Sequence, residues 1–348
     1  LVSCEAFRTV CGDNMVIKYK IAFAAAALLM LSGCTNLTEF DHSMRAGVNI
    51  FYTPDLENVH TIENISGARS ICGLPDCFVV ATTEGTLIRY DLVSYEQTGI
   101  FSIGSPSSAG YFQIEYSPTE SSVYIIGALG QIIELHVPDM DFMDEFSVCE
   151  TPVDTEISMD IENLNFYVAG ATLSRVLEVK KVNNGLSRIC SMPFSPVCMA
   201  IDSDTILVGT NGNTCIVSLD GGAMLSRQMS LFPEILAIET IPNDTNLCAV
   251  FNQFSITIAT VLHYFPMYFP PYEPMWINSG AIEGEIHYMC AESDGSYVYV
   301  LSYLGDNSSR LVAYNCTDYS IENQIDLPGY PLDIAISPGG TLLVLTAD

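Results

Sequence analysis

One short strand pattern recurs along most of the chain at a nearly constant spacing, and this repetition constrains the fold more than any other feature. Successive copies begin 38, 45, 44, 39, 41 and 55 residues apart. Periods of this length are typical of repeat architectures, in which each repeat is one supersecondary unit. The copies begin at Val48, Thr86, Gln131, Arg175, Thr214, Ser255 and Arg310.

Three other strand patterns accompany each copy, and we name the four patterns a, b, c and d in chain order. The pattern described above is c. Pattern b comes directly before c, as in Phe78–Ala81 and Leu342–Leu345, and pattern a comes before b, as in Phe112–Tyr116. Pattern d follows c, as in Gln324–Leu327. Four strands in a period near 40 to 45 residues predict a β-propeller blade. A β-sandwich, the alternative, does not repeat in register.

The two ends of the repeat region hold complementary halves of one unit. Residues 48–65 supply patterns c and d, and residues 329–345 supply a and b around the turn Ser337-Pro338-Gly339-Gly340. Two strands alone are marginally stable in water, so we expect the halves to pair. The sequence therefore predicts an all-β domain over residues 47–348. This domain is a seven-bladed β-propeller of four-stranded antiparallel blades, closed by N-terminal strands c and d pairing with C-terminal strands a and b.

The last blade has the spacing Gly329-x-Pro331-x-x-Ile334-x-Ile336-Ser337-Pro338-x-Gly340-x-x-Leu343-Val344. Tyr116-Ser117-Pro118 and Ser293-Asp294-Gly295 are weaker copies of parts of this spacing in other blades. The spacing resembles the YVTN-type propeller repeat, a relative of the WD-repeat and NHL families. The resemblance implies a propeller over residues 47–348 without implying a ligand.

Residues 15–33 have the pattern of a lipoprotein signal peptide. Two lysines precede the apolar run Ile21–Leu31, which is too short to span a bilayer. Leu31-Ser32-Gly33-Cys34 resembles a bacterial lipobox, which implies cleavage before Cys34 and a lipid such as palmitate on that residue. An ordinary secretory signal with a chance cysteine is the alternative.

We therefore interpret residues 1–14 as an over-extended reading frame before Met15, and residues 34–46 as the lipidated cysteine with a short tether. Thr35 stands where aspartate retains lipoproteins in the inner membrane, so the resemblance implies an outer-membrane location in the bacterial envelope. The formal net charge of −29 argues against nucleic acid as a partner. It also disfavours charge-driven adhesion to anionic lipid, so we expect membrane contact through the lipid on Cys34.

Catalytic and metal-binding patterns are absent from the sequence. The five histidines form no His-x-x-His spacing, and the cysteines form no Cys-x-x-Cys spacing. Asp139-Met-Asp141 and Asp202-Ser-Asp204 lack the rest of a calcium loop and are typical turn residues. We predict no catalytic residue, no metal and no cofactor, while a site gathered from several blades at the central channel remains the alternative.

Nine cysteines follow Cys34, and most fall in or near predicted strands. Buried free cysteine behaves as a small apolar residue, and this is our default interpretation. Cys72 and Cys77 flank the turn Gly73–Asp76, so a disulfide between these two is the alternative.

The segment His263–Trp276 contains the single tryptophan and is rich in tyrosine, phenylalanine and proline. It falls between patterns c and d of one blade, and its prolines prevent most of it from joining the sheet. Exposed, stiffened aromatics are typical of binding sites for a protein or a glycan; a loop that folds back over its own blade is the alternative. The candidate binding residues are Tyr264, Phe265, Tyr268, Phe269, Tyr272 and Trp276.

The sequence favours, over an enzyme, a lipid-anchored envelope β-propeller that acts as a protein- or ligand-binding scaffold. One alternative is a propeller enzyme, lactonase-like or lyase-like, with a metal-dependent site at the mouth of the channel. Another is an outer-membrane protein assembly factor that binds unfolded chains by offering a strand edge.

Overall fold

The computed structural model describes residues 44–103, 111–127, 131–147 and 283–347, apart from residues 138 and 319. It also describes Ile241 and the backbone of the strands between residues 155 and 278. Residues 42–348 make one compact unit, and residues 1–41 make another, which lies outside the described residues. The expectations for residues 1–33 and Cys34 therefore fall outside the described part. Within that part, no helix has the length and hydropathy needed to span a membrane.

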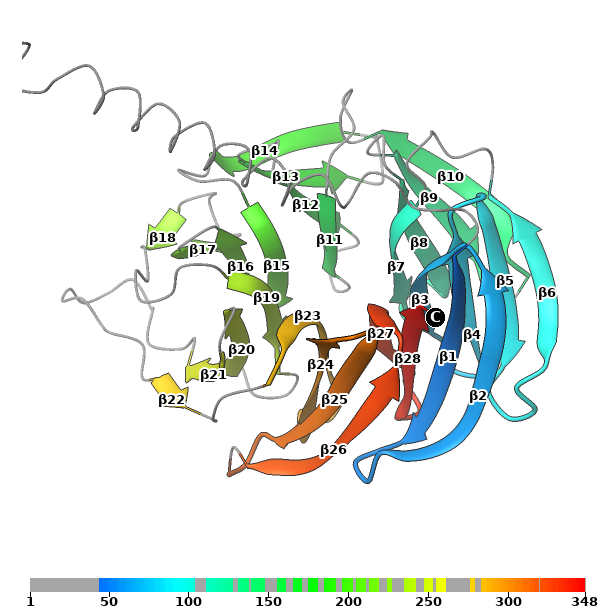
Figure 1. Cartoon of the computed structure of the whole chain (residues 1–348). Coiled ribbons are helices and arrows are strands. Elements are labelled where there is room, and N and C mark those ends of the chain that lie inside the picture. The colour runs from blue at the N-terminus through cyan, green and yellow to red at the C-terminus, as the bar shows by residue number, and fades with distance from the viewer. Residues whose placement is uncertain are drawn as a thin grey trace, which may run out of the picture. The chain divides into compact units, whose positions relative to one another are not determined.

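The described strands form seven four-stranded antiparallel sheets (Figure 1). We name them A to G, each in the order of patterns a, b, c, d. Sheet A contains β27 (Tyr330–Ile336), β28 (Thr341–Ala347), β1 (Arg45–Tyr52) and β2 (Glu57–Ser66). Sheet B contains β3 (Ala68–Gly73), β4 (Cys77–Thr82), β5 (Thr86–Asp91) and β6 (Gln97–Ser102). Sheet C contains β7 (Tyr111–Ser117), β8 (Ser122–Gly127), β9 (Gln131–His136) and β10 (Asp141–Ser147).

The other four sheets follow the same plan. Sheet D contains β11 (Thr155–Asp160), β12 (Asn165–Gly170), β13 (Arg175–Lys180) and β14 (Gly185–Ser191). Sheet E contains β15 (Pro196–Asp202), β16 (Thr205–Thr210), β17 (Asn213–Ser218) and β18 (Met224–Ser226). Sheet F contains β19 (Ile235–Thr240), β20 (Leu247–Asn252), β21 (Ser255–Thr260) and β22 (Trp276–Asn278). Sheet G contains β23 (Glu285–Ala291), β24 (Tyr297–Gly305), β25 (Ser308–Asn315) and β26 (Ile321–Pro328).

The N-terminal and C-terminal strands pair in sheet A, as the sequence predicts. Ile50 of β1 lies opposite Leu343 of β28, and Tyr52 lies opposite Thr341. β1 begins at Arg45, two residues before the expected start of the domain, because Ala46 also pairs with Ala347. Those two residues therefore belong to the sheet and not to the tether.

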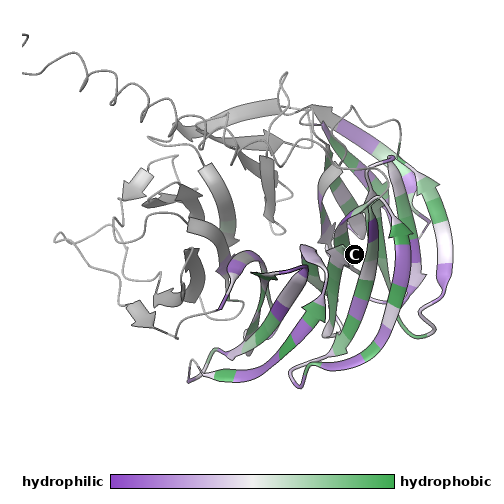
Figure 2. Cartoon of the chain, viewed as in Figure 1, coloured by the Kyte–Doolittle hydropathy of each residue, from purple (hydrophilic) through white to green (hydrophobic). Residues whose placement is uncertain are grey.

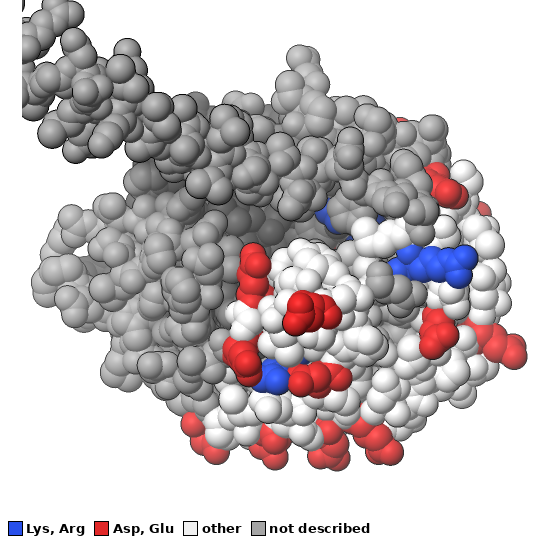
Figure 3. All heavy atoms as spheres, viewed as in Figure 1, with Lys and Arg blue, Asp and Glu red and all other residues white. Residues whose placement is uncertain are grey.

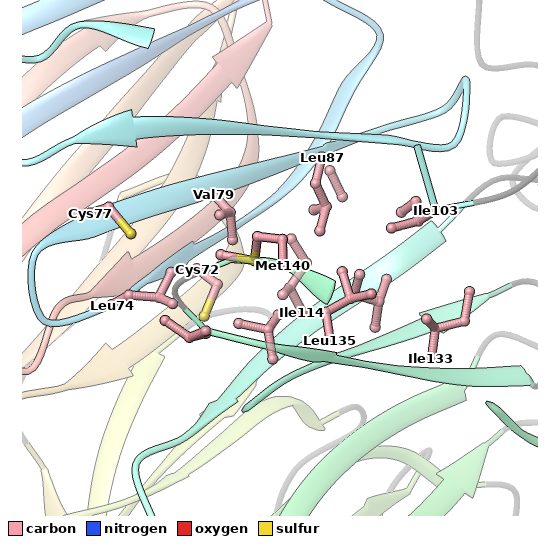
Figure 4. Close-up of a cluster of buried hydrophobic side chains, with 14 residues drawn as sticks. Cys72, Leu74, Cys77, Val79, Leu87, Ile103, Ile114, Ile133, Leu135 and Met140 are labelled. Carbon is pink, nitrogen blue, oxygen red and sulfur yellow. The ribbon is translucent and has the colours of Figure 1, made fainter. Parts of the chain in front are cut away.

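Neighbouring sheets pack through apolar side chains. Val79, Leu87, Ile114 and Leu135 belong to one buried cluster that joins sheets B and C (Figure 4). Phe51 and Val344 of sheet A pack with Tyr299 of sheet G in a second cluster. The outer strands instead alternate hydrophilic and hydrophobic bands (Figure 2), as expected where only one face of a strand is covered.

Each described sheet has two kinds of end, because its strands are antiparallel. Strands a and c begin at one end, which we call the arginine end because Arg45, Arg69 and Arg310 lie at or near it. The a–b and c–d turns lie at the other end, which we call the acidic end. In sheets A, B, C and G the acidic end consists of residues 53–56, 74–76, 92–96, 118–121, 137–140, 292–296, 316–320 and 337–340.

The first strands of the sheets share an irregularity that the sequence patterns did not reveal. A one-residue register shift lies near the start of each of β3, β7, β15, β19, β23 and β27. Such a bulge re-aims the residues that follow it. Ser70, Gln113, Tyr288 and Asp333 are the residues directly after the bulge in sheets B, C, G and A.

Candidate functional site

Most of the residues that the sequence singled out for binding lie outside the described part of the chain. This holds for Cys34 and for Tyr264, Phe265, Tyr268, Phe269 and Tyr272. Trp276 is the first residue of β22, where its backbone lies opposite Ala259 of β21. The segment between these strands is therefore a c–d connection, as predicted, and both of its attachment points lie at the acidic end of sheet F.

Cys72 and Cys77 are free, buried thiols, so the alternative of a disulfide between them is not what the structure contains. The register explains their separation: Cys72 lies opposite Val79, while Cys77 pairs with Asp91 on the other side of β4. Both contribute to the apolar cluster between sheets B and C (Figure 4), which agrees with the default interpretation.

The isolated histidines and aspartates occupy places that suit ordinary structural roles. His60 lies exposed on β2, and His136 ends β9. Asp139 and Asp141 flank Met140, whose φ of 57° marks a tight turn. Among the described residues, no group of three histidine, cysteine, aspartate or glutamate side chains is arranged to hold a metal ion.

A polar group on the first strands joins sheets A and B. The carboxylate of Asp333 in β27 accepts hydrogen bonds from Ser70 Oγ at 2.5 Å and from the Ile71 amide at 2.9 Å, both in β3. Burial raises the pKa of Asp333 to about 6, against the opposing effect of these hydrogen bonds and of Arg69. The contact therefore ties two sheets together through an acid that titrates near neutrality.

Glu115 extends this group into sheet C. Its carboxylate accepts a hydrogen bond from Gln113 Nε2 at 2.7 Å, yet burial raises its pKa to about 7, and Asp333 raises it further. Cys72 lies within electrostatic reach of both acids, and burial raises its pKa well above the ordinary value. We call Asp333, Ser70, Cys72, Glu115 and Gln113 the first-strand cluster. Its acids can exchange protons near neutral pH, whereas its thiol stays protonated and is a poor nucleophile.

An aromatic group lies at the arginine end, where sheets G and A meet. The ring of His287 in β23 lies 5.0 Å from the ring of Tyr330 in β27, and Tyr303 in β24 lies 4.9 Å from Tyr330. The Tyr330 hydroxyl is 3.4 Å from His287 Nδ1, while Nε2 is buried with no hydrogen-bond partner among the residues that the structure describes. Burial lowers the pKa of His287, so the imidazole is neutral at pH 7.

A second aromatic group lies at the acidic end, where sheets A and B meet. The rings of His60 in β2 and Tyr95 in the β5–β6 turn stack with centroids 4.7 Å apart and an interplanar angle of 10°. Tyr52 lies within electrostatic reach of Tyr95 and remains 53% exposed. Val93, in the same turn as Tyr95, is 86% exposed. We call these four residues the acidic-end patch.

The two ends differ in charge. In the part of sheets A, B, C and G that the structure describes, the acidic end carries carboxylates and no lysine or arginine. Acidic side chains line the lower margin of the space-filling view, over β26 and β2 (Figure 3). At the other end, Arg310 forms ion pairs of 2.6 Å with Glu283 and with Asp326. The exposed carboxylates that lie in the turns of the acidic end or within two residues of them are Asp55, Glu57, Asp76, Glu96, Asp139, Asp141, Asp294, Asp318 and Glu322.

Sequence reasoning missed the first-strand cluster and both aromatic groups. A polar residue before a large apolar one, as in Ser70-Ile71, Gln113-Ile114 and Asp333-Ile334, was a signal that could have located the cluster. The aromatic groups had no comparable local signal, because each is assembled from two sheets.

Comparison with solved structures shows the fold. The β-propeller domain of Cps50 (Swd1) from Myceliophteria thermophila has a TM-score of 0.62 at 13% identity, covering 80% of this chain and 96% of its own. A chain of the mitotic checkpoint complex has a TM-score of 0.62 at 11% identity, covering 79% and 88%. The dihydro-heme d1 dehydrogenase NirN has a TM-score of 0.58 at 14% identity, covering 88% and 69%.

These likenesses, together with the four-stranded antiparallel sheets, show that the chain has a β-propeller fold. No family model matches the sequence, and no curated protein is similar to it at a significant level. At these identities the similar structures carry the fold alone. The chemistry of the site must be argued from this chain's own residues.

Proposed function

We propose that the chain is a lipid-anchored protein of the bacterial envelope whose propeller acts as a scaffold for a protein partner. The single observation that carries the binding function is the acidic-end patch, where exposed Tyr52 and His60 of sheet A lie with the half-buried ring of Tyr95 and the exposed Val93 of sheet B. Exposed aromatic and apolar groups that gather in one place are typical of binding surfaces. The aromatic segment 264–275 joins its sheet at the same kind of end, which is consistent with this role.

The proposed scaffold is a closed propeller of seven YVTN-type blades. The pairing of β1 with β28 supports closure, since it completes a four-stranded sheet from the two ends of the chain. Contacts between the first strands of successive sheets, from β27 through β3 to β7 and from β19 through β23 to β27, support it as well. A closed arrangement leaves few unprotected strand edges and gives a rigid support for binding loops.

The anchor rests on the Leu31-Ser32-Gly33-Cys34 sequence and is tested first. We expect the full chain, expressed in a Gram-negative bacterium, to incorporate labelled palmitate and to fractionate with the outer membrane. A Cys34→Ser variant should lose the label and leave the membrane fraction. Labelling that survives in this variant, or a wild-type chain found only in soluble fractions, would reject the anchor.

The binding function is tested by photo-crosslinking in the same cells. A photoreactive residue in place of Val93 should capture a partner, because that side chain is exposed in the same turn as Tyr95. A matched chain with the photoreactive residue at Ile100, which is 60% exposed on the outer strand β6, should not. Replacing Tyr264, Phe265, Tyr268, Phe269, Tyr272 and Trp276 with serine tests whether the aromatic segment contributes.

The first-strand cluster and the His287 group favour a second candidate, a propeller enzyme with a site in or near its channel. Asp333 and Glu115 have pKa values near neutrality, and general acid–base catalysis uses such groups. His287 lies at the arginine end with a buried nitrogen that is unpaired among the described side chains. A lactonase-like or lyase-like activity that Glu115→Gln abolishes, with partner capture unchanged, would put this candidate first.

A further inference from the structure

The acidic-end patch has the form of a preorganised binding surface. Its two supporting turns are both held by hydrogen bonds. In the β5–β6 turn, one oxygen of the Asp91 carboxylate accepts from the Val93 amide at 2.9 Å and from the Ser94 amide at 2.6 Å. In the β1–β2 turn, Thr53 Oγ1 donates to the Gly340 carbonyl at 3.0 Å. Asn323 Nδ2 of sheet G donates to the Asp55 carbonyl at 2.5 Å. Because both turns are fixed before binding, little conformational entropy remains to be lost.

Exposed carboxylates lie in the turns that carry the patch and in the turn next to them. Glu57 pairs with Tyr52 across β1 and β2, Glu96 follows Tyr95, and Asp76 lies in the neighbouring turn, where its carbonyl accepts from the Leu92 amide at 3.1 Å. The hydrogen bonds from Ser94 and Val93 lower the pKa of Asp91, so this carboxylate is ionised at neutral pH. An aromatic centre with an acidic rim therefore faces solvent.

This combination selects one class of partner. Aromatic faces attract lysine and arginine side chains, and carboxylates around them supply complementary charge and faster association. Anionic lipid and nucleic acid would be repelled by the same rim. We infer that the acidic-end patch docks a basic, lysine- or arginine-rich segment of a protein partner. The inference rests on the scaffold function proposed above and names the partner chemistry of that site.

The test uses the purified full chain in zwitterionic detergent and a short labelled peptide in which lysine alternates with serine and valine. We expect saturable binding that weakens about tenfold when NaCl is raised from about 50 to about 300 mM, since screening reduces the attraction. The same peptide with glutamate in place of lysine should not bind. Equal binding of both peptides would overturn the inference.

Matched variants localise the binding. Tyr52→Ser, and Tyr95→Asn, which tolerates the φ of 60° at that position, should each weaken binding at least about fivefold. Phe142→Ser, at a residue 63% exposed on β10, should leave it unchanged. Glu57→Gln should weaken it, whereas Glu84→Gln, in an exposed turn at the arginine end, should not. Thermal melts of each variant exclude loss of folding.

Two outcomes separate this inference from the scaffold proposal. If cells yield a crosslinked partner at position 93 but the lysine peptide is not bound, the basic-segment inference fails and the scaffold stands. If the peptide binds and both tyrosine variants lose it, but no partner is captured, the scaffold proposal fails and the surface assignment stands. Tyrosine-dependent binding of a neutral chito-oligosaccharide in place of the peptide would assign the patch to a glycan and overturn the inference.

Discussion

Glu115 and Asp333 are acids in surroundings that favour the uncharged form. Burial raises the pKa of Glu115 to about 7 and that of Asp333 to about 6. An acid whose pKa is higher in the folded than in the unfolded chain stabilises the fold below its unfolded pKa, and this stabilisation is lost as pH rises through the folded pKa. The propeller is therefore expected to gain stability from both groups as pH falls below 7.

Replacing Glu115 with glutamine tests this linkage. Glutamine keeps an oxygen that can accept from Gln113 but cannot ionise. We expect the variant to be more stable than the wild type at pH 7.5 by on the order of 2 kcal/mol, and this advantage to vanish near about pH 4, below the unfolded pKa. Chemical denaturation of the wild type and the variant at both pH values measures this difference in unfolding free energy.

The control is Glu84→Gln, in an exposed turn, which should show no such pH-dependent difference. His287 acts in the opposite direction, because its lowered pKa costs stability as pH falls, so only the difference between wild type and variant is informative. A constant difference at the two pH values would contradict the assignment of Glu115.

Gly329 and Gly305 are a matched pair of glycines with positive φ, 96° and 88°. A Cβ at Gly329 would overlap the carbonyl of Ala347 in β28, whereas a Cβ at Gly305 would meet nothing within 4 Å. We expect Gly329→Ala to cost about 3 kcal/mol or more, and Gly305→Ala about 1 kcal/mol from backbone strain alone. If denaturant titrations show equal losses of unfolding free energy for the two variants, backbone strain alone requires glycine at position 329, and the close approach of β28 does not.

The positions of the strands along the chain are what the local sequence predicted best. Patterns b and c fall on strands in every sheet, because alternating or continuous apolar residues bounded by turn residues specify strands locally. Pattern d is the weakest of the four in the structure as well: in sheet E its strand β18 covers only Met224–Ser226. Outer strands are half-exposed, so their patterns carry less apolar signal.

The outer strand β2 is ill suited to the strand-edge alternative. It exposes Glu57, His60 and Glu63 along its length. Charged side chains on an edge oppose pairing with another chain. An assembly factor that works by strand addition would need an edge with fewer charges.

Deleting β1 and β2 tests the pairing of the chain ends. Without residues 1–66, β28 loses the partner that covers it in sheet A, and Phe51 is lost from the cluster shared with Tyr299. We expect that chain to aggregate in size-exclusion chromatography, whereas a chain lacking only residues 1–43 should elute as a folded species. Comparable elution of both would contradict the structural role of the pairing.

At the scale of the whole molecule, the net charge of −29 is concentrated unevenly. Carboxylates at the acidic end repel one another, and added salt screens this repulsion. We expect the melting temperature to rise by a few degrees between about 20 and about 300 mM NaCl. The Debye length falls over that range to well below 10 Å.

Metal dependence is tested in the same melts. Calcium chloride at matched ionic strength should raise the melting temperature no more than sodium chloride does, and a chelator should leave it unchanged. A larger calcium effect, or a stoichiometric metal in elemental analysis, would favour the metal-dependent enzyme over the scaffold.

The sequence by itself determined the repeating four-strand unit and the pairing of its two terminal halves. Both follow from short-range apolar periodicity and turn chemistry, which are written within a few residues. Only the tertiary structure decided which polar and aromatic side chains meet. Ser70 reaches Asp333 across 263 residues, and His60 stacks on Tyr95 from another sheet. Such contacts depend on bulges and on the packing of neighbouring sheets, which no local pattern encodes.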